Sequence, residues 1–221
     1  MKDKVLAVLK NTDGYVSGQE LCEELGVSRT AVWKAVNALK EAGYEIESVR
    51  NRGYMLKSCP DVLLSEEIKS VLDTKWFANK ILYFDKIDST NSEIKRQAEQ
   101  GASEGTLAIA EYQSAGRGRR GRSWDSPAGS GIWMSFLIKP DIRPEHAPMI
   151  TLLAAMACAS AVRDVTGLEA MIKWPNDIVI GGRKITGILT EMSTGMETIS
   201  YIVVGIGINA NMTEFPEDIR K

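Results

Sequence analysis

The spacing of hydrophobic residues changes along the chain and separates two regions. In the first 57 residues apolar positions recur at helical spacing, as between Val32 and Leu39, which is typical of amphipathic helices. Ser17 and Ser28 precede two such segments and are suited to cap their first turns. Two strands are then predicted, at residues 44–49 and 53–57. Helix, short turn, helix and two-stranded wing together predict a winged helix-turn-helix.

The remainder of the chain is dominated by short apolar runs that are typical of strands. Strands are predicted at residues 81–84, 106–112, 132–138, 170–173, 177–180, 184–192 and 198–208, and helices at 64–72, 91–100 and 145–165. Tight turns such as Gly181-Gly182 favour hairpins over regular strand-helix alternation. We therefore expect a winged helix-turn-helix domain over residues 1–57, a linker over 58–64, and an α+β domain with a mixed sheet over 65–221.

Composition narrows the possible chemistry. With 221 residues and 44% hydrophobic content, the chain is long enough to bury a sizeable core. Three cysteines without C-x-x-C spacing argue against a disulfide framework or zinc cluster and suit a reducing cytoplasm. His146 is the only histidine, so histidine-based triads and metal sites are nearly excluded. The apolar run 147–162 is short for a membrane span, and a buried helix is expected there.

Charge indicates that any nucleic-acid surface is local. Residues 1–57 carry nine Lys/Arg and eight Asp/Glu, whereas the remainder has a net charge of −3. Cationic residues nevertheless fall on the exposed face of the second helix and at the tip of the wing, which favours DNA over a protein-binding helical domain. The expected DNA contacts are Arg29, Thr30, Lys34, Asn37, Arg50 and Arg52. An exposed Trp33 fits either a groove contact or packing on a neighbouring element.

Four arginines and three glycines alternate over residues 116–122, and Trp124 follows. Glycine lets the backbone approach an anion closely, and arginine offers a planar fork of donors to phosphate or carboxylate. A solvated basic loop or a non-specific nucleic-acid contact would have the same composition. The glycines also fit G-x-G-x-x-G, but residues 123–131 cannot open the helix that a dinucleotide fold requires. We expect a ligand-covering loop between two strands.

Several short motifs occur in an order and spacing that closely resemble the bifunctional biotin protein ligases that also repress biotin synthesis genes. They are Asp-Ser-Thr-Asn at 88–91, Glu-Tyr-Gln-Ser-Ala at 111–115 leading into the arginine loop, Lys-Trp-Pro-Asn-Asp at 173–177, Lys-Ile-Thr-Gly-Ile-Leu at 184–189 and Gly-Ile-Gly-Ile-Asn at 205–209. The resemblance implies that biotin and ATP form biotinyl-5′-AMP, and that a lysine of a biotin carboxyl carrier domain then accepts biotin. It also implies that the adenylate promotes a homodimer that binds operator DNA.

The residue chemistry agrees with what the resemblance implies. The biotin carboxylate and the α-phosphate repel each other, so a cationic site is needed to bring them together. Catalytic roles are expected for Lys184, Arg117 and Arg119, and Asp177 is the expected protein ligand of the Mg²⁺ that accompanies ATP. Neutral donors and acceptors suit the ureido ring of biotin. The expected biotin and adenylate residues are Ser89, Thr90, Asn91, Gln113, Gly116, Arg117, Gly118, Arg119, Arg120, Arg122, Trp124, Lys184, Gly187 and Asn209.

Family members continue beyond the Gly-Ile-Gly-Ile-Asn strand into a small C-terminal β-barrel domain, which we do not expect in a chain ending at Lys221. Two alternative functions predict different ligands or products. A lipoate-type ligase would use the same fold with another ligand, and a non-catalytic ligand-sensing regulator would bind biotin and DNA without forming an adenylate.

Overall fold

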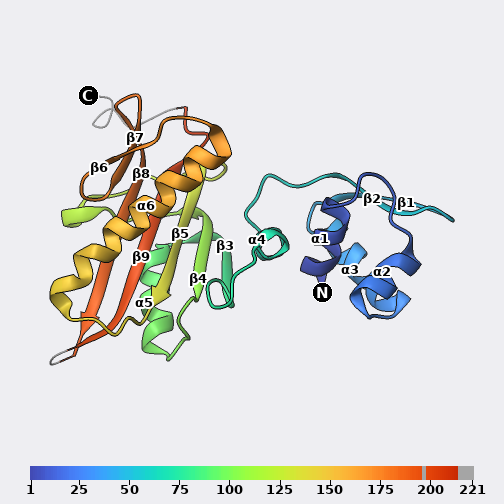
Figure 1. The fold of residues 1–221 in the computed structure, drawn as a ribbon, viewed down its shortest axis with the longest axis horizontal. Helices are drawn as coiled ribbons and strands as arrows, with labels where there is room; N and C mark the ends of the chain where they lie inside the picture. The colour runs from blue at the N-terminus through green and yellow to red at the C-terminus, as the bar shows by residue number, and fades with distance from the viewer. Residues whose placement is uncertain (196–197, 214–221) are drawn as a thin grey trace. The chain divides into compact units, whose positions relative to one another are not determined.

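The computed structural model describes residues 1–195 and 198–213. Over these residues the chain divides into two compact units, one ending at Asp73 and the other beginning at Thr74. Figure 1 shows the first unit in blue to blue-green colours and the second in the colours from green to red. The two units have separate hydrophobic cores.

The N-terminal unit is a small helical core with a two-stranded wing. Its elements are α1 (Lys2–Lys10), α2 (Gly18–Leu25), α3 (Arg29–Glu41), β1 (Glu45–Val49), β2 (Gly53–Ser58) and α4 (Ser65–Val71). Leu6, Leu21 and Leu39, one from each of the first three helices, are fully buried together. Burying each such side chain contributes about 1.5–3 kcal/mol, so this core holds the helix pair in place.

Both predicted helix caps are present, which confirms the helix-turn-helix reading. The Ser17 amide donates to Glu20 Oε2 at 2.7 Å and the Glu20 amide donates to Ser17 Oγ at 3.1 Å, a reciprocal capping box. Gly26 ends α2 with a left-handed φ of 65°, the conformation that glycine adopts without steric cost. The Ser28 hydroxyl then caps α3 by accepting from the Ala31 amide at 3.3 Å. These contacts fix the turn between α2 and α3.

The short helix α4 belongs to the N-terminal unit, contrary to the expectation that residues from 65 onward lie in the second domain. Glu66 is ion-paired with Lys2, and Glu67 is ion-paired with Lys10. Glu67 also accepts a hydrogen bond from the Tyr44 hydroxyl at 2.8 Å. These polar contacts attach α4 to α1 and to the start of the wing. This segment carries no long hydrophobic pattern from which the attachment could be inferred.

The second unit is built on one mixed sheet. Its elements are β3 (Ile81–Ile87), α5 (Thr90–Glu99), β4 (Leu107–Gln113), β5 (Gly131–Ile138), α6 (Ala147–Thr166), β6 (Met171–Lys173), β7 (Asp177–Ile180), β8 (Arg183–Thr194) and β9 (Ile199–Asn209). Among the described residues seven strands pair in the order β3-β4-β5-β9-β8-β7-β6. Only the β3–β4 pair is parallel in this part of the chain. The predicted mixed-sheet α+β fold is confirmed.

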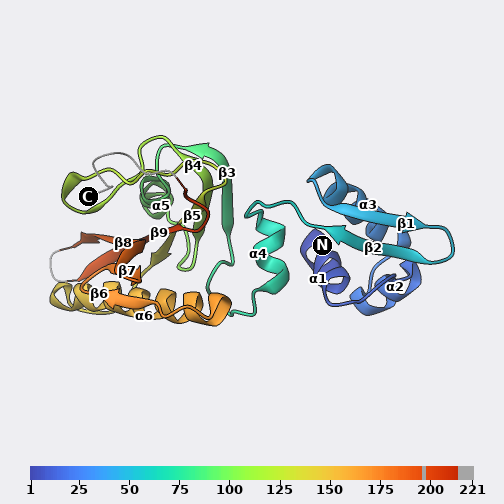
Figure 2. The same ribbon diagram turned by 90° about the horizontal axis from the view of Figure 1, so that it is seen from above.

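The helices α5 and α6 cover opposite faces of the sheet (Figures 1 and 2). Successive residues of β9 alternate between the two faces. Val203 packs with Ile94 of α5, whereas Ile202 and Val204 belong to the core beneath α6. The strand is therefore apolar on both sides, which explains why its sequence reads as a continuous hydrophobic run.

The helix α6 packs on the sheet, but it is buried along one face only. Ala155, Cys158 and Ala159 are buried against the sheet, whereas Leu153 and Met156 are exposed. The segment Pro144–Thr166 is long and apolar enough to cross a membrane by length and composition. Core helices of other proteins pass the same test, and this one packs on the sheet through its small residues.

Candidate functional site

A cavity of about 490 Å³ opens on the α5 side of the sheet. It lies between the N-terminal end of α5, the loop that joins β4 to β5, and the strands β8 and β9. Its size falls within the range of small-molecule sites. The lining residues are Ser89, Thr90, Asn91, Gln113, Arg117, Gly118, Arg119, Arg120, Arg122, Ser123, Trp124, Met134, Trp174, Pro175, Asn176, Asp177, Lys184, Gly187, Ile188, Leu189, Gly205, Ile206 and Gly207.

Nearly all the predicted ligand residues meet in this cavity. Gly116 and Asn209 are the two predicted residues that do not line it. Gly116 is the first residue of the arginine loop, and an added Cβ there would come within 2.8 Å of Ser126 Oγ. Asn209 ends β9 opposite Gly131, and its Oδ1 is buried without a hydrogen-bond partner among the described residues. Both positions support the cavity wall and do not form its surface.

One end of the cavity is neutral and polar. The Ser135 hydroxyl is buried and lies 2.6 Å from Asn91 Oδ1 and 2.7 Å from Thr90 Oγ1. Gln113 Oε1 accepts from the Thr90 amide at 2.8 Å and from its hydroxyl at 3.0 Å. Gln113 Nε2 in turn donates to Ser126 Oγ at 2.8 Å. This connected network holds several donors and acceptors at one end of the cavity, with little freedom to rotate.

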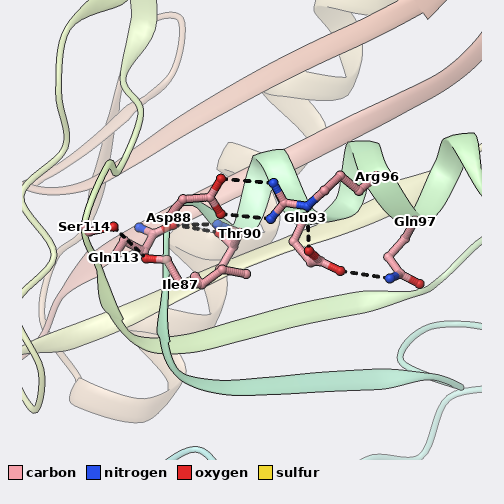
Figure 3. Close-up of polar contacts among 8 residues, drawn as sticks. All are labelled: Ile87, Asp88, Thr90, Glu93, Arg96, Gln97, Gln113 and Ser114. Atoms are coloured by element: carbon pink, nitrogen blue, oxygen red, sulfur yellow. Dashed lines mark hydrogen bonds and ion pairs between the residues drawn. The ribbon is translucent and has the colours of Figure 1, made fainter.

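The start of α5 is fixed by an ionic frame outside the cavity (Figure 3). Arg96 donates to both carboxylate oxygens of Asp88, at 2.9 and 3.0 Å, and to Glu93 at 2.9 Å. The Arg96 hydrogen bonds hold the pKa of Asp88 down at about 2. Ser89 occupies the N-cap position, but its side chain makes no capping hydrogen bond. The start of α5 is therefore held by this ionic frame and not by a serine cap.

The arginine loop closes over the cavity between β4 and β5, as predicted. The Gly118 amide donates to Arg122 O at 2.7 Å, and the Trp124 amide donates to Gly116 O at 2.9 Å. A single 3₁₀ turn, Arg119–Gly121, is the only helical segment over residues 114–130 of the described chain. Arg119 is hydrogen-bonded to the side chain of Asn176. The loop is therefore a folded hairpin, unlike the helix-opening glycine loop of a dinucleotide site.

Trp124 lies flat on glycines of two neighbouring strands. Gly187 of β8 pairs with Gly207 of β9. An added Cβ would come within 2.6 Å of the indole ring at Gly187 and within 2.5 Å of it at Gly207. Lys184 Nζ is 5.1 Å from the centre of the same ring. The indole Nε1 is buried without a hydrogen-bond partner among the described residues. The two glycines therefore make room for the indole ring itself.

The other end of the cavity is strongly cationic. Of the described residues that line it, five are cationic and one, Asp177, is a carboxylate. Lys184 Nζ is 2.8 Å from Asp177 Oδ1, an ion pair across the β7–β8 hairpin. The cationic residues are Arg117, Arg119, Arg120, Arg122 and Lys184. The excess positive charge can stabilise an anionic ligand or charge that develops on oxygen during a reaction.

The sequence analysis missed several residues that organise the site. Ser135 sits within an apolar strand, and Asn176 is buried, donating to Ile188 O at 3.1 Å. Glu191 contacts Arg117 of the loop at 3.2 Å. Trp174 has 78% of its surface exposed and lines the cavity. The signal for Glu191 was a lone carboxylate at an inward position of β8, two residues beyond Leu189.

The N-terminal unit presents the predicted DNA contacts on one helix and one turn. Arg29, Thr30 and Lys34 are exposed on α3, whereas Asn37 is half-buried. Trp33 is 57% exposed, so it does not pack into the core of its unit. At the wing tip Arg50 and Arg52 are both exposed.

Two contacts order this surface. Arg29 donates to Gln19 Oε1 at 3.0 Å, and the Arg52 guanidinium lies 4.2 Å from the centre of the Tyr15 ring. The second contact stacks a cation on an aromatic face and orients the wing tip.

Two family models match the chain. Residues 83–209, which contain the cavity, match the biotin/lipoate A/B protein ligase family, and residues 2–55 match a helix-turn-helix domain. The chain belongs to the biotin/lipoate A/B protein ligase family. This family contains the biotin protein ligases that the motifs resemble, so the resemblance seen in the sequence is confirmed.

Two curated relatives match nearly the whole of this chain. It is 41% identical to the bifunctional ligase/repressor BirA of Bacillus subtilis, over 99% of this chain and 68% of the relative. The bifunctional ligase/repressor BirA of Escherichia coli is 34% identical, over 98% of this chain and 65% of the relative. The chain therefore spans about two thirds of the length of these curated relatives.

Solved structures of ligases share the fold of the second unit. The biotin protein ligase from Aquifex aeolicus in complex with biotin and ATP has a TM-score of 0.54 at 33% identity, covering 64% of this chain and 57% of that one. The biotin protein ligase from Leishmania major in complex with biotinyl-5-AMP has a TM-score of 0.53 at 28% identity, covering 63% and 61%.

Proposed function

We propose that this chain is an ATP-dependent biotin protein ligase, which forms biotinyl-5′-AMP and transfers biotin to a lysine of a biotin carboxyl carrier protein. The observation that carries the proposal is the division of one cavity into a neutral polar end and a cationic end. Biotin has the same division, with an uncharged ureido ring at one end and a carboxylate at the other. The bifunctional names of the relatives support the same activity.

The roles of the residues follow from their chemistry. Thr90, Asn91 and Gln113 would bind the ureido ring through neutral hydrogen bonds. Arg117 and Arg119 would lie along the carboxylate and the α-phosphate, with Lys184 as the principal catalytic cation. Two further residues, Arg122 and Trp124, would contact the nucleotide. Gly187 and Gly207 leave room for the Trp124 indole against the sheet, because a Cβ at either position would collide with that ring.

The reaction would proceed in two displacements. A biotin carboxylate oxygen attacks the α-phosphorus of ATP, a new P–O bond forms, and the bond to pyrophosphate breaks. Pyrophosphate leaves with the electron pair. The amine of the carrier lysine then attacks the acyl carbon, AMP leaves, and the amine loses a proton to give the amide. In both steps charge on oxygen rises before the leaving group departs, and the cationic end of the cavity is suited to stabilise it.

Mg²⁺ would accompany ATP at Asp177. Asp177 is the one acidic residue among the described residues that line the cavity. The described part of the chain has no cluster of three or more His, Cys, Asp or Glu side chains that could hold a metal ion. That donor set fits an ion held mainly by phosphates and water, as Mg²⁺ usually is. When bound, Mg²⁺ would neutralise part of the triphosphate charge. Asp177 would then exchange its Lys184 partner for the ion.

The N-terminal unit would bind operator DNA of biotin synthesis genes as part of a homodimer that forms when the adenylate is bound. Exposed Arg29 and Lys34 on α3 and the cations of the wing tip support backbone contacts with DNA. We propose a DNA-binding unit that ends at Asp73 and includes α4, and a ligase unit that begins at Thr74. The cytoplasm would suit the three free cysteines.

The experiment is to incubate the protein with ATP, Mg²⁺ and either biotin or lipoate, and to identify the adenylate by mass spectrometry. The proposal predicts biotinyl-5′-AMP and little lipoyl-AMP. A lipoyl product alone would assign the lipoate-type activity instead. Biotin-dependent DNA binding without any adenylate would favour a non-catalytic sensor.

A further inference from the structure

Glu191 connects three separate elements behind the cavity. It lies on β8, and its side chain is only 17% exposed. Its Oε1 lies 2.7 Å from Lys95 Nζ and 3.2 Å from Arg117 Nη2. Its Oε2 accepts from Asn91 Nδ2 at 2.8 Å. Oε1 therefore contacts two cations, and Oε2 accepts a hydrogen bond from an amide.

The described residues that line the cavity of about 490 Å³ do not include Glu191, but they include two of its partners. Asn91 belongs to the neutral end, and Arg117 belongs to the cationic end. A single carboxylate thus touches both halves of the candidate site from behind. Its position on β8, which pairs with β9 along most of its length, makes it a rigid support.

The electrostatics favour a charged Glu191. Burial raises the pKa of its carboxyl, but hydrogen bonds from Lys95 and Asn91 and the nearby Arg117 charge lower it further, so the net shift is downward. The carboxylate faces two cations, so it does not cancel the positive charge of Arg117 completely. Ordering a long arginine side chain costs rotamer entropy. Anchoring Arg117 before the ligand arrives removes part of that cost from binding.

We propose that Glu191 is a positioning residue: it holds the Arg117 guanidinium in place for the carboxylate of biotin. This inference rests on the proposed function, because it takes biotin as the ligand. Glu191 acts through Arg117 and does not touch substrate. A carboxylate that only stabilised the fold would affect all ligands alike, whereas a residue that positions a cation affects the charged ligand selectively.

The first test compares a charged with an uncharged ligand. Glu191→Gln keeps an oxygen that can accept from Asn91 but loses the charge that holds Arg117. We expect the Kd for biotin to rise about tenfold, which is about 1.4 kcal/mol, and the Kd for biotin methyl ester to change less than twofold. The control is Glu99→Gln, an exposed carboxylate on α5, which should leave both values unchanged. Equal weakening of both ligands, or tighter biotin binding, would overturn the proposal.

A double variant tests whether Glu191 acts through Arg117. In an Arg117→Ala background, Glu191→Gln should cause no further loss of biotin affinity, because the cation that it positions is gone. A further tenfold loss would contradict the proposed route.

A ligand-free measurement separates this proposal from the proposed function. In ¹⁵N-labelled protein the guanidinium signal of Arg117, assigned by its loss in Arg117→Ala, should shift in Glu191→Gln and stay unchanged in Glu99→Gln. An unshifted signal in Glu191→Gln would refute the positioning role even if biotin binds. Failure of the unaltered protein to bind biotin would refute the proposed function, while the guanidinium signal would still decide the contact.

Discussion

Gly205→Ala places one methyl group at the most crowded point of the candidate site. Gly205 lies on β9 between Ser135 of β5 and Leu189 of β8. A Cβ there would come within 2.7 Å of Asn91 Cγ and closer still to Asn91 Oδ1. The backbone at this position does not have the left-handed φ that would exclude alanine. The effect therefore comes from packing and not from backbone strain.

The magnitude follows from two terms. Forcing a methyl into a packed site costs about 1–3 kcal/mol. Displacing Asn91 also breaks its hydrogen bond with the buried Ser135 hydroxyl at 2.6 Å, which keeps Thr90 as a partner, and the loss of one such bond costs about 0.5–1.5 kcal/mol. We therefore expect the free energy of unfolding of the second unit to fall by about 1.5–4.5 kcal/mol. Biotin binding should be lost with it, since Asn91 lines the cavity.

The assay is urea unfolding followed by tryptophan fluorescence, because four of the five tryptophans lie at or beyond Thr74. Gly18→Ala is the control, since its Cβ would meet only Tyr54 at an ordinary 3.8 Å. In an Asn91→Ala background the obstruction is absent, and Gly205→Ala should cost less than about 1 kcal/mol. An equal cost in both backgrounds, or a cost below about 0.5 kcal/mol in the unaltered background, would refute the reasoning.

Three further predictions concern the site, the wing and the ionic frame. Arg119→Ala should raise the barrier to adenylate formation by about 2–4 kcal/mol while the fold is kept; single-turnover kinetics with unchanged circular dichroism checks this, and full activity would contradict it. Arg52→Ala should flatten the salt dependence of DNA binding by about one unit of slope, whereas Asn37→Ala should mainly reduce sequence discrimination; binding to operator and random DNA across a salt series distinguishes them, and an unchanged slope for Arg52→Ala would exclude wing contact. Asp88→Asn should lower the free energy of unfolding by no more than about 1 kcal/mol at pH 7, because the pair with Arg96 is half-exposed. The pKa of Asp88 is lowered in the folded protein to about 2, so its contribution is present above the unfolded pKa near 4 and is lost as the pH falls toward 2; a difference that persists below pH 2 would contradict this.

Local patterns predicted the elements of this fold well. The capping box at Ser17, the left-handed turn at Gly26 and the cap at Ser28 depend on residues close in sequence, so they could be read directly. The arginine loop was also predictable, because a segment rich in arginine and glycine has no place in a core. Residues 123–131 excluded a dinucleotide-binding loop, because they cannot open the helix that such a loop requires.

Long-range packing could not be predicted from the sequence. Ser135 reads as a minor interruption of an apolar strand, and its role appears only when α5 brings Asn91 against it. In the sequence Glu191 is one charge on a long strand. In the structure it contacts Lys95, 96 positions earlier in the chain, and Arg117, 74 positions earlier. The exposed side of α6 was missed because apolar composition does not reveal what covers a face.

The most direct test of the central claim is biotin-dependent exchange of labelled pyrophosphate into ATP. Exchange requires that the biotin carboxylate attack the α-phosphorus reversibly in the cavity. We predict that the unaltered protein catalyses exchange with biotin and Mg²⁺, and that Lys184→Ala reduces it at least about 30-fold, as expected for loss of about 2 kcal/mol or more of transition-state stabilisation. Exchange that is absent with biotin, or unchanged in Lys184→Ala, would contradict the assignment of this cavity as the site of adenylate formation.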